Sequence, residues 1–470
     1  MSERLLRIAV LVPAVLTFAC GGDDDTCDPV AQEGCDPGFV CEVVDGQEDP
    51  GCFDPVVVRG EVFDLADDSG VGDARIVGLD ANSSPVSSVA LSDDNGLYEL
   101  VVPTRRTADG TPVGDEFTLR ADAPGYQTFP GGVRQALPID SADAVQDGDD
   151  GVWVVENPLT RLGLIGLPAD AGTGFIYGNV EVPERRIGTL VVAEGSDGIG
   201  YNAIADRDGD YAILNLPADD YVVQAYARYV NYDPAEVSLG DDDEAEVDLS
   251  LNDMAASTLT GSVSIVNGGE GDGTSVVLVV ASTFDEVLIR GQSPPGLRAP
   301  DPGLQADVHG AFSIEGVPEG TYVVLAAFEN DYLVRDPDPC IGGTELVTQE
   351  VGGATTVDME ESFKITGSLD MVAPGSDGPQ AVGPTPTLEW VDDSSEDAYD
   401  VIVVDSFGNV VWEERFLDLS GDTVSVDYAG EPLEPGMYYQ WRVTSVRKVG
   451  DVPECKISTT EDLKGVFYLE

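Results

Sequence analysis

The sequence predicts an all-β protein, built as a string of antiparallel β-sandwich modules behind a short disulfide-rich N-terminal segment. Glycine and proline clusters typical of turns recur along its 470 residues, which favours many short strands over long helices. One pattern of turn and strand residues occurs three times, which indicates successive similar modules. Four cysteines gather near the N-terminus in a stretch too short for an apolar core, which is typical of a disulfide-linked segment.

The chain is strongly acidic. It has 88 acidic and 23 basic residues and a net charge of −65. Nucleic acids and anionic lipid headgroups are bound through Lys and Arg, so this composition argues against both as partners. Hydrophobic residues make up 42% of the chain, which is typical of globular proteins and not of disordered ones.

The N-terminus has the features of an export signal, expected to cover residues 1–19. Arg4 and Arg7 form a short basic region before the apolar run at 8–19. That run is too short to span ~30 Å of hydrocarbon as a helix, so it is expected to direct secretion and not to anchor the chain by itself.

The stretch "LTFAC" resembles the lipobox of bacterial lipoproteins, which implies that Cys20 is lipidated and tethers the chain to a membrane. Residues 20–26 would then form a polar tether. Cleavage after Ala19 without lipidation is the alternative. Gly21 resembles the sorting pattern of lipoproteins destined for the outer membrane, which implies a location at the outer membrane or cell surface.

Segment 27–53 is expected to be held by disulfides, since exported proteins meet an oxidising compartment. Its pairing is left open by the sequence. A zinc site is the alternative, but the segment lacks C-x-x-C spacing and histidine. Across the chain the disulfide candidates are Cys27, Cys35, Cys41, Cys52, Cys340 and Cys455.

The repeated pattern is Asp, two residues, Gly, one residue and an aromatic, with a proline a few residues later. It occurs in "LSDDNGLYELVVP" (91–103), "IADRDGDYAILNLP" (204–217) and "QADVHGAFSIEGVP" (305–318). Its members are Asp93, Gly96, Tyr98 and Pro103, then Asp206, Gly209, Tyr211 and Pro217, then Asp307, Gly310, Phe312 and Pro318.

Each copy is interpreted as the tip of a β-hairpin. Asn95, Asp208 and His309 precede the glycine, and these residue types are enriched at positive φ, which two-residue hairpin turns need at both central positions. The leading aspartate can accept hydrogen bonds from backbone N–H groups of the turn.

A calcium loop is the alternative for the second copy. Asp206, Asp208 and Asp210 would be its oxygen ligands, and they are weak candidates because the spacing departs from that of an EF-hand. We expect no metal site there.

Each module opens with an extended run that contains glycine, at 56–64, 174–182 and 257–265. With the D-x-x-G-x-[YF] turn and the P-x-x-x-Y strand that follows, these runs resemble the carboxypeptidase regulatory-like family, a seven-stranded transthyretin-like sandwich. The resemblance covers roughly 56–363 and implies three such sandwiches, at 55–160, 172–254 and 257–363.

The last module, 372–470, resembles a fibronectin type III domain. "PTPTLEW" places Trp390 where that family buries a tryptophan of strand B, and "LEPGMYY" matches its L-x-P-G-x-x-Y corner. The resemblance implies that the hydroxyl of Tyr439 caps this corner and that Trp390 belongs to the core.

Cys340 and Cys455 are predicted to pair across the junction of the last two modules. Two strands at about 344–351 and 354–363 are expected to run antiparallel to each other, with Cys340 just before the first. The fibronectin type III resemblance implies that Cys455 lies in a loop between strands that end near Val446 and start near Gly465, facing the preceding module.

No catalytic constellation is visible in the sequence. His309 is the only histidine, and no G-x-S-x-G elbow, P-loop or dinucleotide fingerprint occurs. We therefore expect a protein without enzymatic activity or cofactor, which acts as a stalk or binding scaffold of the cell envelope for a protein or glycan partner. A carbohydrate-binding lipoprotein and an accessory part of an envelope enzyme complex are the alternatives.

Overall fold

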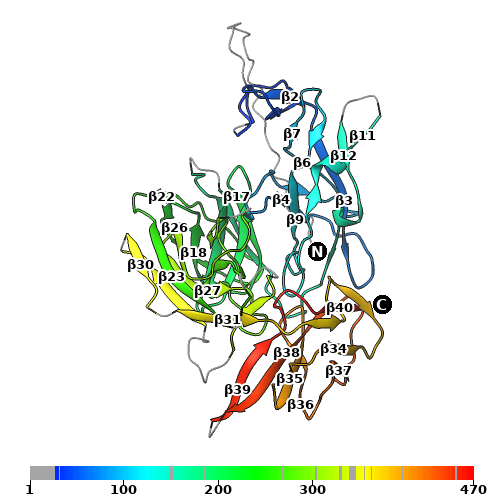
Figure 1. The fold of residues 1–470 in the computed structure, drawn as a ribbon. Coiled ribbons are helices and arrows are strands. Elements are labelled where there is room, and N and C mark those ends of the chain that lie inside the picture. Colours follow the sequence, from blue (N-terminus) through cyan, green and yellow to red (C-terminus); the bar gives the residue numbers. More distant parts are fainter. Residues whose placement is uncertain are drawn as a thin grey trace.

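A computed structural model describes residues 27–30, 32–148, 152–183, 187–266, 268–269, 271–301, 304–327, 331–337, 346–353, 355–360, 362–393, 395–449 and 452–470. Over these residues the chain is all-β, with a small disulfide-linked segment followed by four β-sandwiches (Figure 1). The predicted signal, Cys20 and Cys340 lie outside the described residues. Within the described residues, no helix has the length and apolar character needed to cross a membrane.

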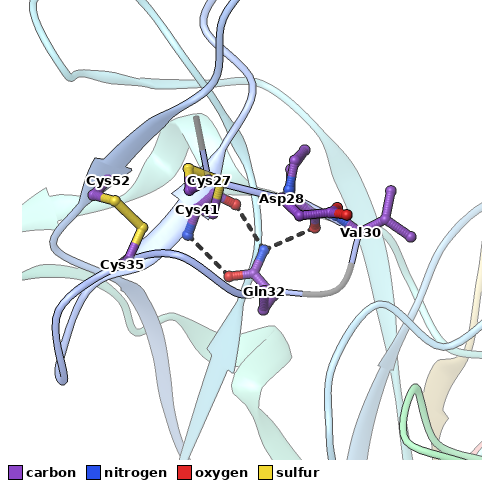
Figure 2. Close-up of a disulfide and its surroundings, with 8 residues drawn as sticks. Cys27, Asp28, Val30, Gln32, Cys35, Cys41 and Cys52 are labelled. Carbon is purple, nitrogen blue, oxygen red and sulfur yellow. Dashed lines mark hydrogen bonds between the residues drawn. A yellow bond between two sulfur atoms is a disulfide. The ribbon is translucent and has the colours of Figure 1, made fainter. Parts of the chain in front are cut away.

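The N-terminal segment is a knot of two short strands, β1 (Val40–Glu42) and β2 (Gly51–Phe53), which pair antiparallel. Disulfides join Cys27 to Cys41 and Cys35 to Cys52, with Cα–Cα distances of 5.8 and 5.7 Å. Figure 2 shows the side chain of Gln32 donating to the carbonyl oxygen of Cys41 and accepting from its N–H. The disulfide prediction for this segment is confirmed, and the paired sulfurs leave no thiolate for zinc.

Module 1 denotes residues 56–164. Its elements are β3 (Val56–Asp64), β4 (Arg75–Leu79), β5 (Ala90–Leu91), β6 (Leu97–Val102), β7 (Arg105–Arg106), β8 (Pro112–Val113), β9 (Glu116–Asp122), β10 (Ile139–Asp140), η1 (Ser141–Asp143), β11 (Val145–Gln146), β12 (Trp153–Val155), η2 (Pro158–Thr160) and β13 (Arg161–Leu164). One sheet has the order β10-β9-β4-β5, and the other has the order β11-β12-β3-β13 with β6 paired to β3.

Module 2 denotes residues 174–252. Its strands are β14 (Gly174–Asn179), β15 (Thr189–Gly195), β16 (Gly200–Ala205), β17 (Asp210–Leu216), β18 (Asp219–Tyr226), β19 (Asn231–Tyr232), β20 (Ala235–Leu239), β21 (Glu244–Glu246) and β22 (Leu251–Asn252). They form the sheets β17-β14-β21 and β16-β15-β18-β20 and the pair β19-β22.

Module 3 denotes residues 257–367. Its elements are β23 (Ser257–Val266), β24 (Val276–Val280), η3 (Ala281–Thr283), β25 (Arg298–Ala299), β26 (Ala311–Val317), β27 (Gly320–Ala326), β28 (Leu333–Arg335), β29 (Val347–Val351), β30 (Thr356–Asp358) and β31 (Phe363–Gly367). The sheets are β26-β23-β31-β28, with β30 beside β23, and β25-β24-β27-β29.

A glycine at the centre of each opening strand lies opposite the repeated aromatic. Gly60 pairs with Tyr98, Gly178 with Tyr211, and Gly261 with Phe312. A Cβ on Gly60 would collide with the ring of Tyr98 and with the carbonyl oxygen of Thr160, so the chain needs glycine where ring and backbone approach this closely.

The opening strands also pair in parallel with strands from the end of their own modules. β3 pairs with β12 and then β13, β14 with β21, and β23 with β30 and then β31. The all-β sandwich class is confirmed, but the sheets are mixed, because the closing strands return beside the opening strand in the same direction. β13 and β31 also continue modules 1 and 3 past the expected ends at 160 and 363.

The repeated turn joins two sheets, which the hairpin interpretation did not foresee. β16 and β17 flank the second copy but belong to different sheets of module 2. The N–H of Gly209 donates to the carbonyl oxygen of Asp206, and Gly209 has φ +90°, whereas Asp208 has no positive φ. The expected positive φ before the glycine is therefore wrong. In modules 1 and 2 a β-turn followed by one left-handed glycine, Gly96 or Gly209, forms the tip instead, whereas Gly310 of module 3 has no positive φ.

Module 4 denotes residues 371–469. Its strands are β32 (Met371–Ala373), β33 (Gln380–Val382), β34 (Thr387–Val391), β35 (Ala398–Asp405), β36 (Val410–Leu417), β37 (Thr423–Asp427), β38 (Tyr438–Val449), β39 (Val452–Thr459) and β40 (Val466–Leu469). The sheets are β32-β34-β37 and β33-β40-β38-β35-β36, with β39 beside β38. Trp390 and Trp441 are fully buried between them, as a sandwich core requires.

Two expectations for the predicted Cys340–Cys455 bridge are wrong. β29 pairs with β27 and β30 with β23, so the strands near 347–358 do not pair with each other. Cys455 lies on β39, which forms a long hairpin with β38, and not in a loop. Cys455 is buried and takes part in a disulfide. Because Cys340 lies outside the described residues, this pairing stays a prediction.

Candidate functional site at the module junctions

The acidic turn of module 2 is built around the carboxylate of Asp206. Its Oδ1 accepts the N–H groups of Asp208 and Asp210 at 2.9 and 3.0 Å, and its Oδ2 accepts the N–H of Val89 in module 1 at 3.0 Å. Burial raises the pKa of Asp206, partly offset by these three N–H groups. The oxygens of this calcium candidate are thus used by the turn and by the junction with module 1.

The other two former calcium candidates also bind protein groups. Asp208 accepts the hydroxyl of Ser88 in module 1 at 2.6 Å, and Asp210 accepts the side-chain amide of Asn179 at 2.9 Å. Among the described residues, the metal-ligating side chains that lie close enough together to share an ion are Cys27, Cys35 and Cys41, and all three are in disulfides.

In module 1, the carboxylate of the corresponding turn faces solvent. Asp93 accepts the N–H groups of Asn95 and Leu97 at 2.8 and 3.0 Å and stays exposed. In module 3, the imidazole Nδ1 of His309 lies 2.6 Å from the carbonyl oxygen of Asp307. His309 itself is exposed.

A docking contact repeats between modules 1 and 2 and between modules 2 and 3. The N–H of Gly125 donates to Oδ1 of Asn215 at 2.7 Å, and the N–H of Tyr229 donates to the carbonyl oxygen of Gly316 at 2.7 Å. Both donors and both acceptors have positive φ, between +62° and +79°. Asn215 and Gly316 occupy the same place in the repeat, six residues after the turn glycine.

Side chains reinforce this repeated contact. The amide of Asn215 donates to the carbonyl oxygens of Ala123 and Tyr126. At the next junction, the guanidinium of Arg228 donates to the carbonyl oxygen of Glu315 at 2.8 Å. None of these residues was among the sites predicted from the sequence, although the matching positions of Asn215 and Gly316 after the repeated motif were a signal that could have identified them.

An apolar cluster spans modules 1 to 3. Val77 and Leu79 on β4 belong to it, together with Leu190 and Val192 on β15 and with core residues of module 3. Tyr226 of module 2 meets Tyr322 of module 3 edge to face, with 6.1 Å between the ring centroids. Because this surface is removed from water only when the modules dock, it favours one body over independently moving domains.

Module 4 closes back onto module 1, as Figure 1 shows for the orange-red and cyan strands. The amide of Gln127 donates to the carbonyl oxygen of Ser406 at 2.6 Å, and the hydroxyl of Ser406 donates back to Oε1 of Gln127 at 2.8 Å. The guanidinium of Arg134 lies over the rings of Phe129 and Tyr438 at 4.6 and 4.8 Å from their centroids.

An insertion of module 3, residues 281–297, fills the space between modules 1, 3 and 4. Leu288 joins an apolar cluster with Val133 of module 1 and with Val404 and Val466 of module 4. The guanidinium of Arg290 donates to the carbonyl oxygens of Gly132 and Asp462, at 3.0 and 2.9 Å. One arginine thus connects all three modules.

The same junction buries several charged groups. Asp462 is almost fully buried, and burial raises its pKa to about 6 although Arg442, Arg290 and Arg335 oppose the shift. Burial also lowers the pKa of Arg290 to about 10. Perturbed groups of this kind gather at functional sites and at structural ion networks.

The N-terminal knot is fastened to module 1 by a buried ion pair. Glu42 of β1 and Arg106 of β7 pair with both side chains inaccessible to solvent. The second carboxylate oxygen of Glu42 accepts the N–H of Thr104, and Arg106 also donates to the carbonyl oxygens of Gly110 and Asp54. Burial raises the pKa of Glu42 despite this partner.

An open groove of about 990 Å³ lies on module 1. Arg59 and Arg161 line it, each paired with acidic side chains. Leu91 and Leu97 are exposed beside them. The groove combines apolar contact area with charged hydrogen-bonding groups, which suits recognition of a polar polymer such as an extended peptide or a glycan.

The corner predicted for module 4 is present. The N–H of Glu434 donates to the hydroxyl of Tyr439 at 2.8 Å, and the ring of Tyr439 packs in the core beside Phe467. Residues 377–461 match the family model described as "Rha78A-like, N-terminal immunoglobulin domain". The match covers only module 4 and shows an immunoglobulin-like sandwich there.

Among curated proteins, no relative matches this chain. Among solved structures, a DUF3823 family protein from Bacteroides uniformis has 14% identity and a TM-score of 0.21, and the alignment covers 46% of this chain and all of that one. The shaft pilin SpaA of Lactobacillus rhamnosus GG has 12% identity and a TM-score of 0.17, with 42% and 98% covered.

A third similar structure is BcpA, the major pilin subunit of Bacillus cereus, with 11% identity, a TM-score of 0.18 and 66% and 99% of the two chains covered. Overall similarity at this level carries no functional argument. The family match at 377–461 is therefore what the comparisons establish: the C-terminal module is similar to immunoglobulin-like domains.

Proposed function

We propose that this chain is a lipid-anchored protein of the cell envelope that acts as a rigid, non-enzymatic scaffold for binding a partner. The main support is the closure of module 4 onto module 1, through Gln127 and Ser406 and through the apolar cluster around Leu288. A chain of modules that returns on itself in this way presents its surfaces at fixed relative positions.

The location proposed for this scaffold is the outer membrane or cell surface. Two disulfides in the knot suit an oxidising compartment outside the cytoplasm. The knot directly follows the predicted tether, and the buried pair of Glu42 and Arg106 fixes it to module 1. Lipid on Cys20 would then hold the module 1 end of the body at the membrane.

We also assign modules 1 to 3 to carboxypeptidase regulatory-like sandwiches and module 4 to a fibronectin type III-like sandwich. The shared glycine–aromatic pairs, Gly60–Tyr98 and its two counterparts, support the first assignment. The hydrogen bond from Glu434 to Tyr439 supports the second.

The groove on module 1 is the proposed contact surface. Carbohydrate binding by stacking would need exposed, coplanar aromatic rings. Among the described residues the exposed aromatics are Phe39 in the knot and Tyr332 in module 3, and the ammonium of Lys464 lies 4.5 Å from the ring centroid of Tyr332. This pattern favours a protein partner over a glycan.

The anchoring proposal is tested by replacing Cys20 with Ser and fractionating cells. We expect the wild-type chain in the membrane pellet and the variant in the soluble fraction. A variant that stays in the pellet unchanged would contradict lipidation.

The binding proposal is tested with a photo-crosslinking residue at Leu97 in the groove, and with one at Glu413 on module 4 as the control. We expect a crosslinked protein partner at Leu97 alone. A glycan array probed with the same chain is the second arm. Saturable glycan binding that is lost when Arg59 and Arg161 are replaced would favour the carbohydrate alternative.

A further inference from the structure

The loop between β39 and β40, residues 460–465, is buried at the junction of modules 3 and 4. Thr460 is fully buried, and Glu461 and Asp462 are 2% and 8% exposed. The side-chain amide of Gln440, itself fully buried, donates to the carbonyl oxygens of Asp462 and Lys464 at 2.8 and 2.7 Å. The backbone of this loop is therefore held from within module 4.

Module 3 supplies the opposite wall. The guanidinium of Arg290 donates to the carbonyl oxygen of Asp462, and Arg442 of β38 donates to the carbonyl oxygen of Val287 in the module 3 insertion. Lys464 lies over the ring of Tyr332, just before β28. These contacts place the loop between β38, β28 and the insertion.

Glu461 is the unusual member of this loop. Both carboxylate oxygens of Glu461 are buried without a close hydrogen bond, although the backbone N–H of Tyr332 faces the carboxylate and favours its ionised form. A buried ionised carboxylate without hydrogen bonds is costly, so native structures rarely keep one. Burying a protonated carboxyl at this place costs much less free energy than burying the carboxylate.

The charges that face the loop come from all the elements packed against it. Those affecting Glu461 are Lys464 and the carboxylates of Asp331 and Asp462. Those affecting Asp462 are Arg442 on β38, Arg290 in the insertion, Arg335 on β28, and Asp331. The three arginines compensate Asp462, whereas Glu461 faces one ammonium and two acidic side chains.

We propose that this loop is a proton-operated clasp between modules 3 and 4, closed when Glu461 carries a proton and opened when Glu461 ionises. In the closed state the neutral carboxyl stays buried beside Tyr332. In the open state the carboxylate moves into water, and the contacts of Arg290 and Lys464 are released with it. The linker at 368–370 keeps the modules connected.

The direction in which pH moves the clasp follows from the raised pKa of Glu461. Burial raises the pKa of Glu461 from 4.5 to about 7 in the closed state. A raised acid pKa means that the closed state binds the proton more tightly, so its extra stability is complete below pH 4.5 and is lost as pH rises through 7. If the open state has the ordinary value, the closing equilibrium changes by on the order of 100-fold over this range.

Hydrogen exchange of the mature chain tests the clasp, with rates corrected for intrinsic exchange and measured from pH 5 to pH 8.5. We expect amides at 458–466 and 331–335 to exchange faster at alkaline pH by one to two orders of magnitude. Amides in the core strand β35 serve as the internal reference. A flat profile for the clasp amides in the wild-type chain would overturn the proposal without any variant.

Two variants separate the clasp from a merely structural loop. Glu461→Gln removes the titrating group and keeps its shape, so we expect no pH dependence of exchange above pH 6, because the buried Asp462, with a pKa of about 6, titrates below that range. Glu413→Gln, at an exposed position on β36, is the matched control and should keep the wild-type profile. A pH dependence above pH 6 that survives in Glu461→Gln would also overturn the proposal. These outcomes do not depend on anchoring or partner binding, so failure here leaves the proposed function standing.

Discussion

The turns at Asp93 and Asp206 have the same motif and the same local hydrogen bonds but different surroundings. Each aspartate accepts the N–H groups two and four residues later. Asp93 faces solvent, whereas Asp206 is buried and also accepts the N–H of Val89 from module 1. The motif therefore encodes the turn, and the neighbouring module decides whether the turn becomes part of a junction.

The difference also explains why an acidic turn can resemble a metal site. In isolation, three aspartates within five residues suggest oxygen ligands. In the folded chain, N–H groups and a hydroxyl occupy those oxygens. A motif of this kind should be read against its other copies, because the exposed copy shows which bonds the turn itself needs.

The largest expected effect is from Asp206→Ala. It leaves three N–H groups in and around a buried junction without their acceptor, and we expect a loss of about 3 kcal/mol from the free energy of unfolding. Asp93→Ala is the matched control and should cost clearly less, because water can replace the carboxylate there. Urea unfolding of both variants measures the comparison. Equal losses would show that the junction contact to Val89 contributes nothing.

The next effect concerns the repeated docking contact. Asn215→Ala removes one acceptor and two donors between modules 1 and 2 and puts alanine at a positive φ, so we expect a loss of about 2 kcal/mol. Faster hydrogen exchange should appear at 123–126 in module 1. Asn252→Ala in the same module is the control, since the amide of Asn252 donates to Asp233 and accepts the N–H of Met254, bonds that do not reach module 1. Unchanged exchange at 123–126 would contradict the docking role.

A smaller effect is expected from Tyr98→Phe, which gives module 1 the aromatic that module 3 already has. The hydroxyl of Tyr98 donates to the carbonyl oxygen of Thr160 at 2.8 Å, and Tyr211 makes the matching bond to Val247 at 2.6 Å. Losing it should cost about 1 kcal/mol. Thermal unfolding measures it, and Phe312→Tyr in module 3 is the converse change. A loss of several kcal/mol would mean that the ring has also moved.

Local patterns in the sequence were enough to predict the sandwich class, the repeated motif and the corner at Tyr439. Each depends on residues close together in the chain: an aspartate three residues before a glycine, an aromatic two residues after that glycine, a Pro-Gly step before a tyrosine. The closed arrangement of modules could not be predicted this way. It depends on pairs such as Gln127 with Ser406, which are far apart in sequence and match no short motif. The contact between the insertion and module 4 could not be predicted either, because only the fold brings Arg290 to Asp462.

The smallest expected effect is that the two turns respond to pH in opposite directions: the stability contributed by Asp93 falls on acidification, whereas that contributed by Asp206 does not. Hydrogen bonds from Leu97 and Asn95 lower the pKa of Asp93, so its contribution is present above the ordinary value of 3.8 and is lost as pH falls below it. Burial raises the pKa of Asp206, so the folded state binds its proton more tightly and the contribution of Asp206 weakens as pH rises above 3.8.

Lowering the pH from 6 to 3 should therefore loosen the turn at 93–97 while the turn at 206–210 holds or tightens. Amide exchange at these two turns in one sample, corrected for intrinsic rates, measures both effects together. Asp206→Asn should remove the pH response of the second turn and leave that of the first. If both turns loosen in parallel, the surroundings of Asp206 do not control its titration, and the distinction between a free turn and a junction turn would rest on geometry alone.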